Sequence, residues 1–358
     1  MRPDASGFFF CPIAWSRLPR KRDGQDGGIA RRPRVYPLNQ TITSVEGLEA
    51  GHYTDLEHAT GCTVFLCRNG AVGGVDVRGG SPGTRETDLL RPMHRIEQVH
   101  AIVLSGGSAF GLDAASGVVA YLETQGIGFK VGSVVVPIVS SAILFDLGLI
   151  TSDVRPGPEE GRSACLVSSS APMDEGSVGA GTGATVSKLG GLQRAVKGGI
   201  GSAAITLSTG HTVAAAVAVN AIGGIWDYTN GKILAGPRRA GGGFDDSVAL
   251  LLKGESNGPS GPVNTTIGLV ATDAQLSKED ANYLARVSHD GLALSIRPCH
   301  TIRDGDTMFA MATGLNQSPA DLTALGAGAV EATAQAVLRA VRQATGLGGI
   351  PSISELTV

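Results

Sequence analysis

The sequence predicts an α/β protein in which helices pack on mixed and antiparallel sheet. β-prone runs outnumber helical patterns, and several come in pairs joined by turn residues. Two longer helical patterns follow near the C-terminus. The 358 residues are 42% hydrophobic and only 17% charged, which excludes a disordered chain. Aromatic residues make up 4%, so we expect a core of Ala, Val, Leu and Ile.

The first β-prone runs, residues 62–68 and 71–78, are joined by Asn69-Gly70. This dipeptide favours positive φ at both positions and predicts a β-hairpin. Residues 100–104 are typical of a buried strand, and a Ser-Gly-Gly-Ser turn then leads into a helix over 109–124. The longest apolar stretch, 131–150, contains Pro137 and Asp146, which indicates a buried strand and turn rather than a membrane span.

The second half of the chain also contains β-prone runs, turn signals and helical patterns. We expect strands at 205–207 and 212–219, a hairpin at Asn230-Gly231, a loop at 254–262 and a strand at 267–271. Ser277 with Asp280 forms a capping pattern for a helix that reaches His289. Ser318-Pro319 opens a longer helix that ends near residue 345.

Charge is unevenly distributed along the chain. Residues 1–38 hold 8 Lys/Arg and 3 Asp/Glu, a net +5, so the remaining 320 residues carry −8 of the overall −3. We expect 1–38 to be a disordered basic extension, or the product of a start codon placed too early; a basic docking arm is the weaker alternative. Its apolar patch, 8–15, is too short to span a membrane. The net charge gives no reason to predict a nucleic-acid or membrane partner.

Several familiar binding motifs are incomplete or absent in this sequence. Residues 179–184 (GAGTGA) resemble a dinucleotide loop, but a Ser-rich loop precedes them and no acidic residue follows at the required distance. The seven histidines show no metal-ligand spacing, so we predict neither metal nor cofactor. The five cysteines are scattered and odd in number, which indicates a reducing compartment and predicts a cytoplasmic protein.

The junction Asn264-Thr265 offers a specific chemistry. A Thr between a Gly/Pro-rich loop and a buried strand can attack the preceding carbonyl, and hydrolysis of the resulting ester cuts the chain. The new N-terminal Thr then carries both a nucleophile and an α-amine base with an ordinary pKa of about 7.7–8.0. The simpler alternative is that Thr is a good strand residue and Asn a good turn residue, and the local sequence alone favours it.

Six stretches, taken together, resemble the family of L-aminopeptidase/D-Ala-esterase-amidases. They occur in family order and cover the chain from about Thr41 to its end: HAIVLSGGSAFGLD (100–113), PIVSSAILFD (137–146), GSVGAGTGATVSK (176–188), AVN (218–220), NTTIGLVATD (264–273) and DGDTMF (304–309). The family includes β-aminopeptidases and, in a threonine branch that this chain resembles, the 6-aminohexanoate-oligomer endohydrolases (nylon hydrolases).

This resemblance implies a four-layer α/β/β/α sandwich of the N-terminal-nucleophile type. It implies one catalytic domain, 39–358, cut before Thr265 into 1–264 and 265–358, with the fragments associated and the protein a homo-oligomer. Thr265 matches the nucleophile. Asn220 matches an oxyanion donor, although it would also serve as a strand-end cap. Lys188 matches a lysine of the nylon-hydrolase branch, although its spacing alone favours a solvated lysine.

Asp304 and Asp306 match carboxylates that orient the amine and hydroxyl of the nucleophile; the alternative is a tight Asp-Gly turn. Phe145 stands in the substrate pocket where close relatives have a tyrosine. The sequence therefore predicts a self-processing hydrolase of small amides or N-terminal peptide bonds. Two alternatives stay open: an acyltransferase of the glutamate N-acetyltransferase type, and a noncatalytic nucleotide- or ligand-binding protein that uses the Gly-rich loops.

Overall fold

The computed structural model describes residues 41–256 and 263–356. The predicted extension, 1–38, and most of the predicted loop at 254–262 lie outside the described residues. Within the described part, nine strands form one mixed sheet in the order β10-β11-β14-β16-β2-β4-β7-β3, with β1 also paired to β2. These strands are β1 (Glu49–Asp55), β2 (Thr60–Val77), β3 (Thr84–Arg85), β4 (Gln98–Ser105), β7 (Val139–Ile143), β10 (Gly199–Thr206), β11 (Thr212–Asn220), β14 (Thr265–Ala274) and β16 (Thr307–Asn316).

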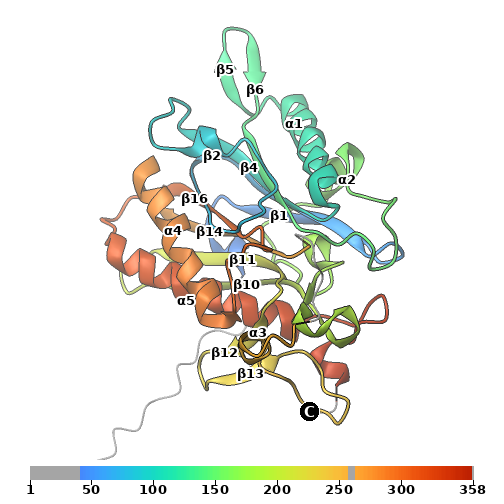
Figure 1. The fold of residues 1–358 in the computed structure, drawn as a ribbon. Coiled ribbons are helices and arrows are strands. Elements are labelled where there is room, and N and C mark those ends of the chain that lie inside the picture. The colour runs from blue at the N-terminus through green and yellow to red at the C-terminus, as the bar shows by residue number, and fades with distance from the viewer. Residues whose placement is uncertain (1–40, 257–262, 357–358) are drawn as a thin grey trace, which may run out of the picture. The chain divides into compact units, whose positions relative to one another are not determined.

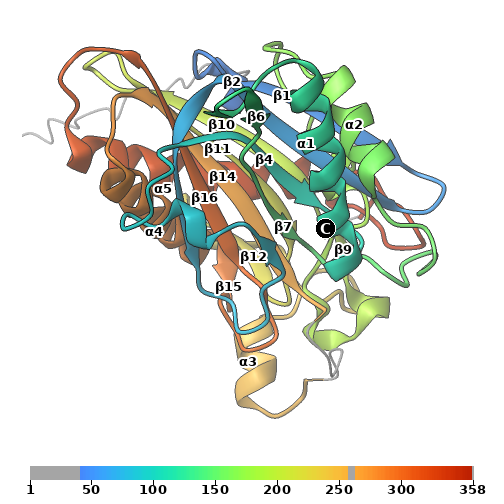
Figure 2. The same ribbon diagram turned by 90° about the horizontal axis from the view of Figure 1, so that it is seen from above.

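The sheet folds over on itself, so that two β layers face each other between helices (Figures 1 and 2). Helices α4 (Lys278–Ser295) and α5 (Leu322–Arg342) cover the layer made by β10, β11, β14 and β16. Helices α1 (Ala114–Thr124) and α2 (Pro158–Leu166) cover the other layer, made by β1, β4, β7 and the first half of β2. The predicted α/β sandwich with mixed and antiparallel strands is confirmed.

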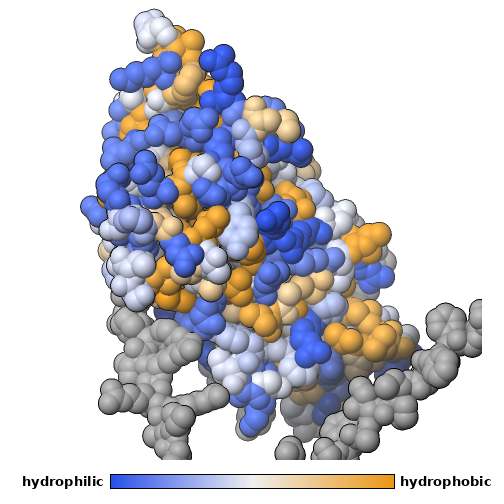
Figure 3. Space-filling model, turned by 90° about the vertical axis from the view of Figure 1, so that its left-hand side faces the viewer, coloured by the Kyte–Doolittle hydropathy of each residue, from blue (hydrophilic) through white to orange (hydrophobic). Residues whose placement is uncertain are grey.

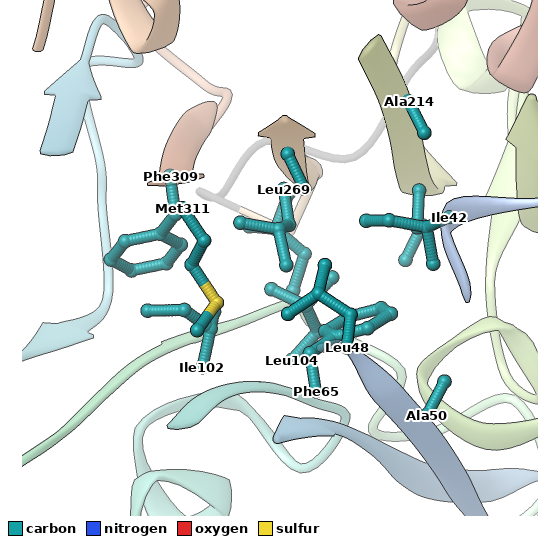
Figure 4. Packing of buried hydrophobic residues seen from close by; sticks show 14 of the residues in the cluster. Ile42, Leu48, Ala50, Phe65, Ile102, Leu104, Ala214, Leu269, Phe309 and Met311 are labelled. Atoms are coloured by element: carbon teal, nitrogen blue, oxygen red, sulfur yellow. The ribbon is translucent and has the colours of Figure 1, made fainter. Parts of the chain in front are cut away.

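Strand alternation explains how one strand serves two interfaces. In β11, Ala214, Ala216 and Ala218 face the space between the β layers, and the residues between them face α5. Side chains from both layers meet in this central core, among them Phe65, Ile102, Leu269 and Phe309 (Figure 4). As the composition predicts, the core is mostly aliphatic, with few rings.

The predicted hairpin at Asn69-Gly70 is wrong, because β2 runs straight through it as one 18-residue strand. Gly70 does have the expected positive φ of 78°. It lies at a bulge, since the pairing with β4 shifts register between Leu66 and Ala71. The two halves pair with different partners, β1 before the bulge and β16 after it. The dipeptide therefore marks where β2 passes from one β layer to the other.

The remaining elements follow the sequence more closely. The strand pair around 208–210 forms, with β10 starting earlier than expected, and Asn230-Gly231 joins β12 (Gly224–Asp227) to β13 (Lys232–Ala235). The capping box of α4 is present as predicted, but the helix continues past His289. Helix α5 begins later than expected, because Asp321 rather than Ser318-Pro319 caps it. Other short elements include α3 (Ser247–Leu252), β8 (Thr185–Val186), β9 (Val196–Lys197) and β15 (Ile296–Arg297).

Residues 131–150 divide differently from the prediction of one buried strand and turn. The buried part is residues 137–144, which include β7, together with Asp146, while β5 (Phe129–Val131) and β6 (Val134–Val136) form a projecting hairpin with exposed apolar side chains. This hairpin projects from the top of the molecule in Figure 1. The same upper end of the surface in Figure 3 carries apolar side chains among polar ones. No helix in the described ranges is long and apolar enough to cross a membrane.

Candidate active site

The site lies where strand β11 ends and the adjacent strand β14 begins. Thr265 is the first residue of β14 and lies directly opposite Asn220, the last residue of β11. Both are buried, with 4% and 0% of their surface exposed. The sheet ladder therefore holds the predicted nucleophile and the predicted amide donor side by side, although 45 positions separate them in the sequence (265 − 220).

The Thr265 hydroxyl donates a hydrogen bond to the carbonyl oxygen of Asn264, the peptide group directly before it. That oxygen also accepts the backbone N–H of Gly305 at 3.0 Å. A donor in this position polarises the carbonyl and stabilises negative charge that develops on its oxygen. The hydroxyl thus lies against the carbonyl that self-cleavage would attack.

Glycine is required at position 305. A Cβ atom added there would lie 2.7 Å from the Ser81 carbonyl oxygen and 2.9 Å from Thr265 Oγ1. Both distances are shorter than real Cβ contacts, so a side chain would displace either the nucleophile or the N–H donor. The middle residue of the Asp-Gly-Asp stretch is therefore as much part of the site as the two carboxylates beside it.

Lys188 is buried rather than solvated, which excludes the surface-lysine alternative. Its ammonium donates to Asn220 Oδ1 at 2.8 Å, to the Asn220 carbonyl at 3.0 Å and to the Val263 carbonyl at 3.3 Å. The Asn220 amide in turn donates to the Phe145 carbonyl at 2.8 Å. Burial lowers the pKa of Lys188 to about 7, against the opposing charge of Asp304. This amine therefore exchanges protons near neutral pH.

The two carboxylates frame the junction without contacting the Thr265 hydroxyl. Asp304 accepts hydrogen bonds from Thr301 and, at 3.5 Å, from the Ile222 N–H. Asp306 accepts the Thr266 N–H at 2.7 Å and binds His300 through its other oxygen. In the uncut chain Asp306 thus fixes the backbone just after Thr265, and Asp304 fixes the loop at Thr301 and the end of β11 near Ile222, whereas the sequence led us to expect contacts with the hydroxyl itself.

Burial, together with the neighbouring Asp306 charge, raises the pKa of Asp304 to about 6. The site thus contains a carboxyl group and an amine that titrate close to each other, and closer to neutrality than their ordinary values. Such shifted pairs are common where proton transfer occurs. Among the described residues, no group of three His, Cys, Asp or Glu side chains could hold a metal ion.

A cavity of about 190 Å³ opens beside the junction. Lys188 and Thr185 line it together with Val263, which lies two residues before Thr265, so the cavity is on the acyl side of the bond. Most of its wall is apolar, from Phe145, Leu147, Leu149 and Leu192. Phe145 thus lines this cavity, and its carbonyl accepts a hydrogen bond from the Asn220 amide.

The Gly-rich loop is a packing element. Gly179–Gly181 forms a short 3₁₀ turn that is buried, and the fully buried Lys197 donates to the Gly181 and Ala184 carbonyls at 3.1 and 2.8 Å. This arrangement differs from a dinucleotide loop, in which backbone N–H groups at a helix start face a phosphate. It disfavours the alternative of nucleotide binding.

Sequence reasoning missed two residues of the site, Gly305 and His300. Gly305 was visible only as a turn residue between the aspartates, because its function depends on a close approach to Thr265. His300 lies six residues before Asp306 and belongs to no recognisable motif. Nothing in its local sequence distinguishes it from the other histidines.

Comparison with known proteins shows the family of this chain. The profile of peptidase family S58 matches residues 40–352, nearly the whole described part of the chain. The chain belongs to peptidase family S58. It is therefore a hydrolase, and the resemblance inferred from the six stretches is confirmed.

Two further members of the family resemble this S58 chain along most of its length. An uncharacterized aminopeptidase of Mycobacterium leprae is 40% identical over 348 residues, covering 88% of this chain and 93% of that protein. A 6-aminohexanoate-oligomer endohydrolase of an Agromyces species is 30% identical over 308 residues, covering 81% and 82%.

Solved structures show the same fold at lower identity. A Burkholderia β-aminopeptidase superposes with a TM-score of 0.63 at 22% identity, covering 87% of this chain and 90% of that one. The L-aminopeptidase D-Ala-esterase/amidase of Ochrobactrum anthropi, described as a variant of the N-terminal-nucleophile hydrolase fold, gives 0.64 at 20% identity, covering 87% and 88%. The predicted N-terminal-nucleophile-like architecture is confirmed.

Proposed function

We propose that this S58 hydrolase cuts its own chain between Asn264 and Thr265 and then uses the new N-terminal Thr265 to hydrolyse small amides or N-terminal peptide bonds. One observation carries the proposal: the Thr265 hydroxyl is bound to the Asn264 carbonyl, whose oxygen also accepts the Gly305 N–H at 3.0 Å. This contact supports the proposal because a hydroxyl, a peptide carbonyl and an N–H donor lie together in the uncut chain.

The self-cleavage step is an acyl shift followed by hydrolysis. Thr265 Oγ1 forms a bond to the Asn264 carbonyl carbon, the bond from that carbon to the Thr265 nitrogen breaks, and the hydroxyl proton ends on the nitrogen. Water then hydrolyses the ester, leaving a carboxylate on Asn264 and a free amine on Thr265. Gly305 N–H stabilises the oxyanion in both steps.

The mature enzyme repeats this chemistry on a substrate. The α-amine of Thr265 accepts the hydroxyl proton, because its ordinary pKa of about 7.7–8.0 lies near working pH. The substrate acyl group is transferred to Oγ1 and released by water. Lys188 and Asn220, whose Nζ and Oδ1 atoms are 2.8 Å apart, are proposed to hold the carbonyl on the acyl side of the bond that is cut. Asp304 and Asp306 are proposed to fix the new N-terminus.

The fragments, of 264 and 94 residues (358 − 264), are proposed to stay associated. Strands β14 and β16 belong to the second fragment and lie between β11 and β2 of the first. Separation would break the sheet on both sides and expose the central core. The expected homo-oligomer and cytoplasmic location stay predictions.

The cavity and the relatives support a substrate class. The apolar wall on the acyl side favours an acyl group with an aliphatic or β-amino-acid chain. The relatives' names specify aminopeptidase and 6-aminohexanoate-oligomer endohydrolase. Assays should therefore compare an amino-acid p-nitroanilide, a β-peptide and a 6-aminohexanoate oligomer, each with and without an added amine. An amine that outcompetes water would favour the acyltransferase alternative.

Denaturing mass spectrometry of wild type, Thr265→Ala and Thr265→Ser tests the proposal. We expect wild type as the 264- and 94-residue fragments and T265A as an intact chain. T265S is the matched control, because it keeps the hydroxyl and loses only a methyl group; it should still be cut. A T265A chain that is cut like wild type, or an intact wild-type chain with full activity, would refute self-processing.

A further inference from the structure

Asp306 is held by a residue that the resemblance does not assign. One carboxylate oxygen, Oδ2, accepts both the backbone N–H of His300 at 2.9 Å and the imidazole Nδ1–H at 2.8 Å. The other oxygen, Oδ1, accepts the N–H of Thr266, the residue after the nucleophile, at 2.7 Å. The Asp306 side chain is only 2% exposed, so a charge there depends on these donors.

The conformation of His300 serves this contact. Its φ is 55°, in the left-handed region that only a few non-glycine residues adopt. This backbone turn brings the N–H and the side chain of one residue onto the same carboxylate oxygen. Local strain of this kind is common at functional sites.

Asp306 is the charge partner of His300, because the neighbouring groups on α4 and β2 are neutral or paired elsewhere. The His289 ring of α4 packs edge-on against the His300 ring, with centroids 4.8 Å apart. His289 itself donates to the Asp76 carbonyl of β2 at 3.0 Å, and burial lowers its pKa to about 4, so it is neutral. Asp76 pairs with Arg78 at 2.8 Å.

The remaining neighbours lie on the loop of His300 itself. Cys299 precedes it, and Asp304 is bound to Thr301 rather than to His300. Burial by itself lowers the pKa of His300, but the bond to Asp306 outweighs it and, with Cys299, raises the pKa to about 10. His300 is thus a cation that contacts one of the two site carboxylates and not the other.

We propose that His300 is a positioning residue of the reaction: its cationic ring and backbone N–H orient Asp306, so that Asp306 fixes the backbone at Thr266 beside the nucleophile. The inference rests on the proposed function of Thr265. It gives the two neighbouring carboxylates different surroundings: Asp306 contacts the His300 cation, and Asp304 does not.

Two variants separate orientation from charge. His300→Asn offers a side-chain N–H in place of Nδ1 without the charge, and His300→Gly keeps only the backbone N–H; both residues adopt positive φ readily. His58→Asn is the matched control. His58 also binds one aspartate, Asp55, through its backbone N–H and its Nδ1, at 2.9 and 2.8 Å, but touches none of the site residues.

The readouts are the cleaved fraction by denaturing mass spectrometry and, per cleaved enzyme, the pH profile of kcat and KM on an amino-acid p-nitroanilide. Loss of the cation should move the acid limb of kcat upward by about 1 pH unit or more in both H300N and H300G. H300G should also lose about 10- to 100-fold in kcat at all pH values. H300N should recover most of that loss on the alkaline side, with KM unchanged and H58N like wild type.

The inference is overturned if cleaved H300N and H300G keep the wild-type acid limb, or if H58N shifts it equally. A wild-type chain that is never cut would instead refute the proposed function, so the two failures are distinguishable. Circular dichroism of each variant confirms that the compared proteins are folded.

Discussion

Replacing Gly305 by Ala tests the most specific feature of the site. The new methyl group would lie 2.9 Å from Thr265 Oγ1 and 2.7 Å from the Ser81 carbonyl oxygen, so either the hydroxyl or the 304–306 backbone must shift. A backbone shift breaks the 3.0 Å bond from Gly305 N–H to the Asn264 carbonyl. Loss of one such donor costs about 2.7–4 kcal/mol, or about 10²–10³ in rate.

The assay follows the intact chain and its fragments over time by denaturing mass spectrometry. We expect G305A to accumulate as the uncut chain long after wild type is fully cut. Gly241→Ala is the matched control, because an added Cβ at Gly241 meets nothing within 4 Å. If folded G305A were cut as fast as G241A, the assignment of Gly305 N–H as the oxyanion donor would be refuted.

Three further predictions follow from the same geometry. Lys188→Met is made in the uncut Thr265→Ala background and compared with T265A alone. Its free energy of unfolding relative to T265A should increase as pH falls from about 10.5 to 7, because the folded lysine holds its proton more weakly than the unfolded one. Urea unfolding at pH 7 and 10 measures this difference, and a difference that does not depend on pH would contradict the prediction. Phe145→Tyr should be cut like wild type, since only the carbonyl of residue 145 contacts Asn220, while kcat/KM on a p-nitroanilide changes by up to about tenfold. Phe65→Ala, in the central core, should lower the free energy of unfolding by about 3–5 kcal/mol in urea titrations, and a loss below 1 kcal/mol would show that the two β layers do not depend on this ring.

Local patterns predicted those elements whose formation depends on nearby residues. The capping pair Ser277 and Asp280 starts α4 where expected, and Asn230-Gly231 joins a real hairpin. Asn69-Gly70 carries the same turn signal, and its glycine has the predicted positive φ, but the chain does not reverse there. Distant partners decided the outcome, because β16 pairs with residues after Gly70 and lies more than 200 residues away in the chain.

The candidate site divides in the same way. The chain order alone indicated Thr265 as a strand-initiating residue after a loop, and the family-like stretches brought in Asn220, Lys188, Asp304 and Asp306. The sequence could not show that Lys188 is buried against Asn220, nor that Asp306 binds the Thr266 N–H rather than the Thr265 hydroxyl. Those contacts join residues on separate strands and loops, so they exist only in the folded sheet.

By itself, therefore, the sequence determined the type of secondary structure, the aliphatic character of the core and the residue types able to do the chemistry. Only the tertiary structure decided that the sheet folds over at Gly70, that Gly305 N–H lies on the Asn264 carbonyl and that His300 holds Asp306. The physical reason is the distance along the chain over which each effect acts. Propensities and caps act over a few residues, whereas a close approach of a few ångströms between segments far apart in the sequence is fixed by the packing of the whole domain.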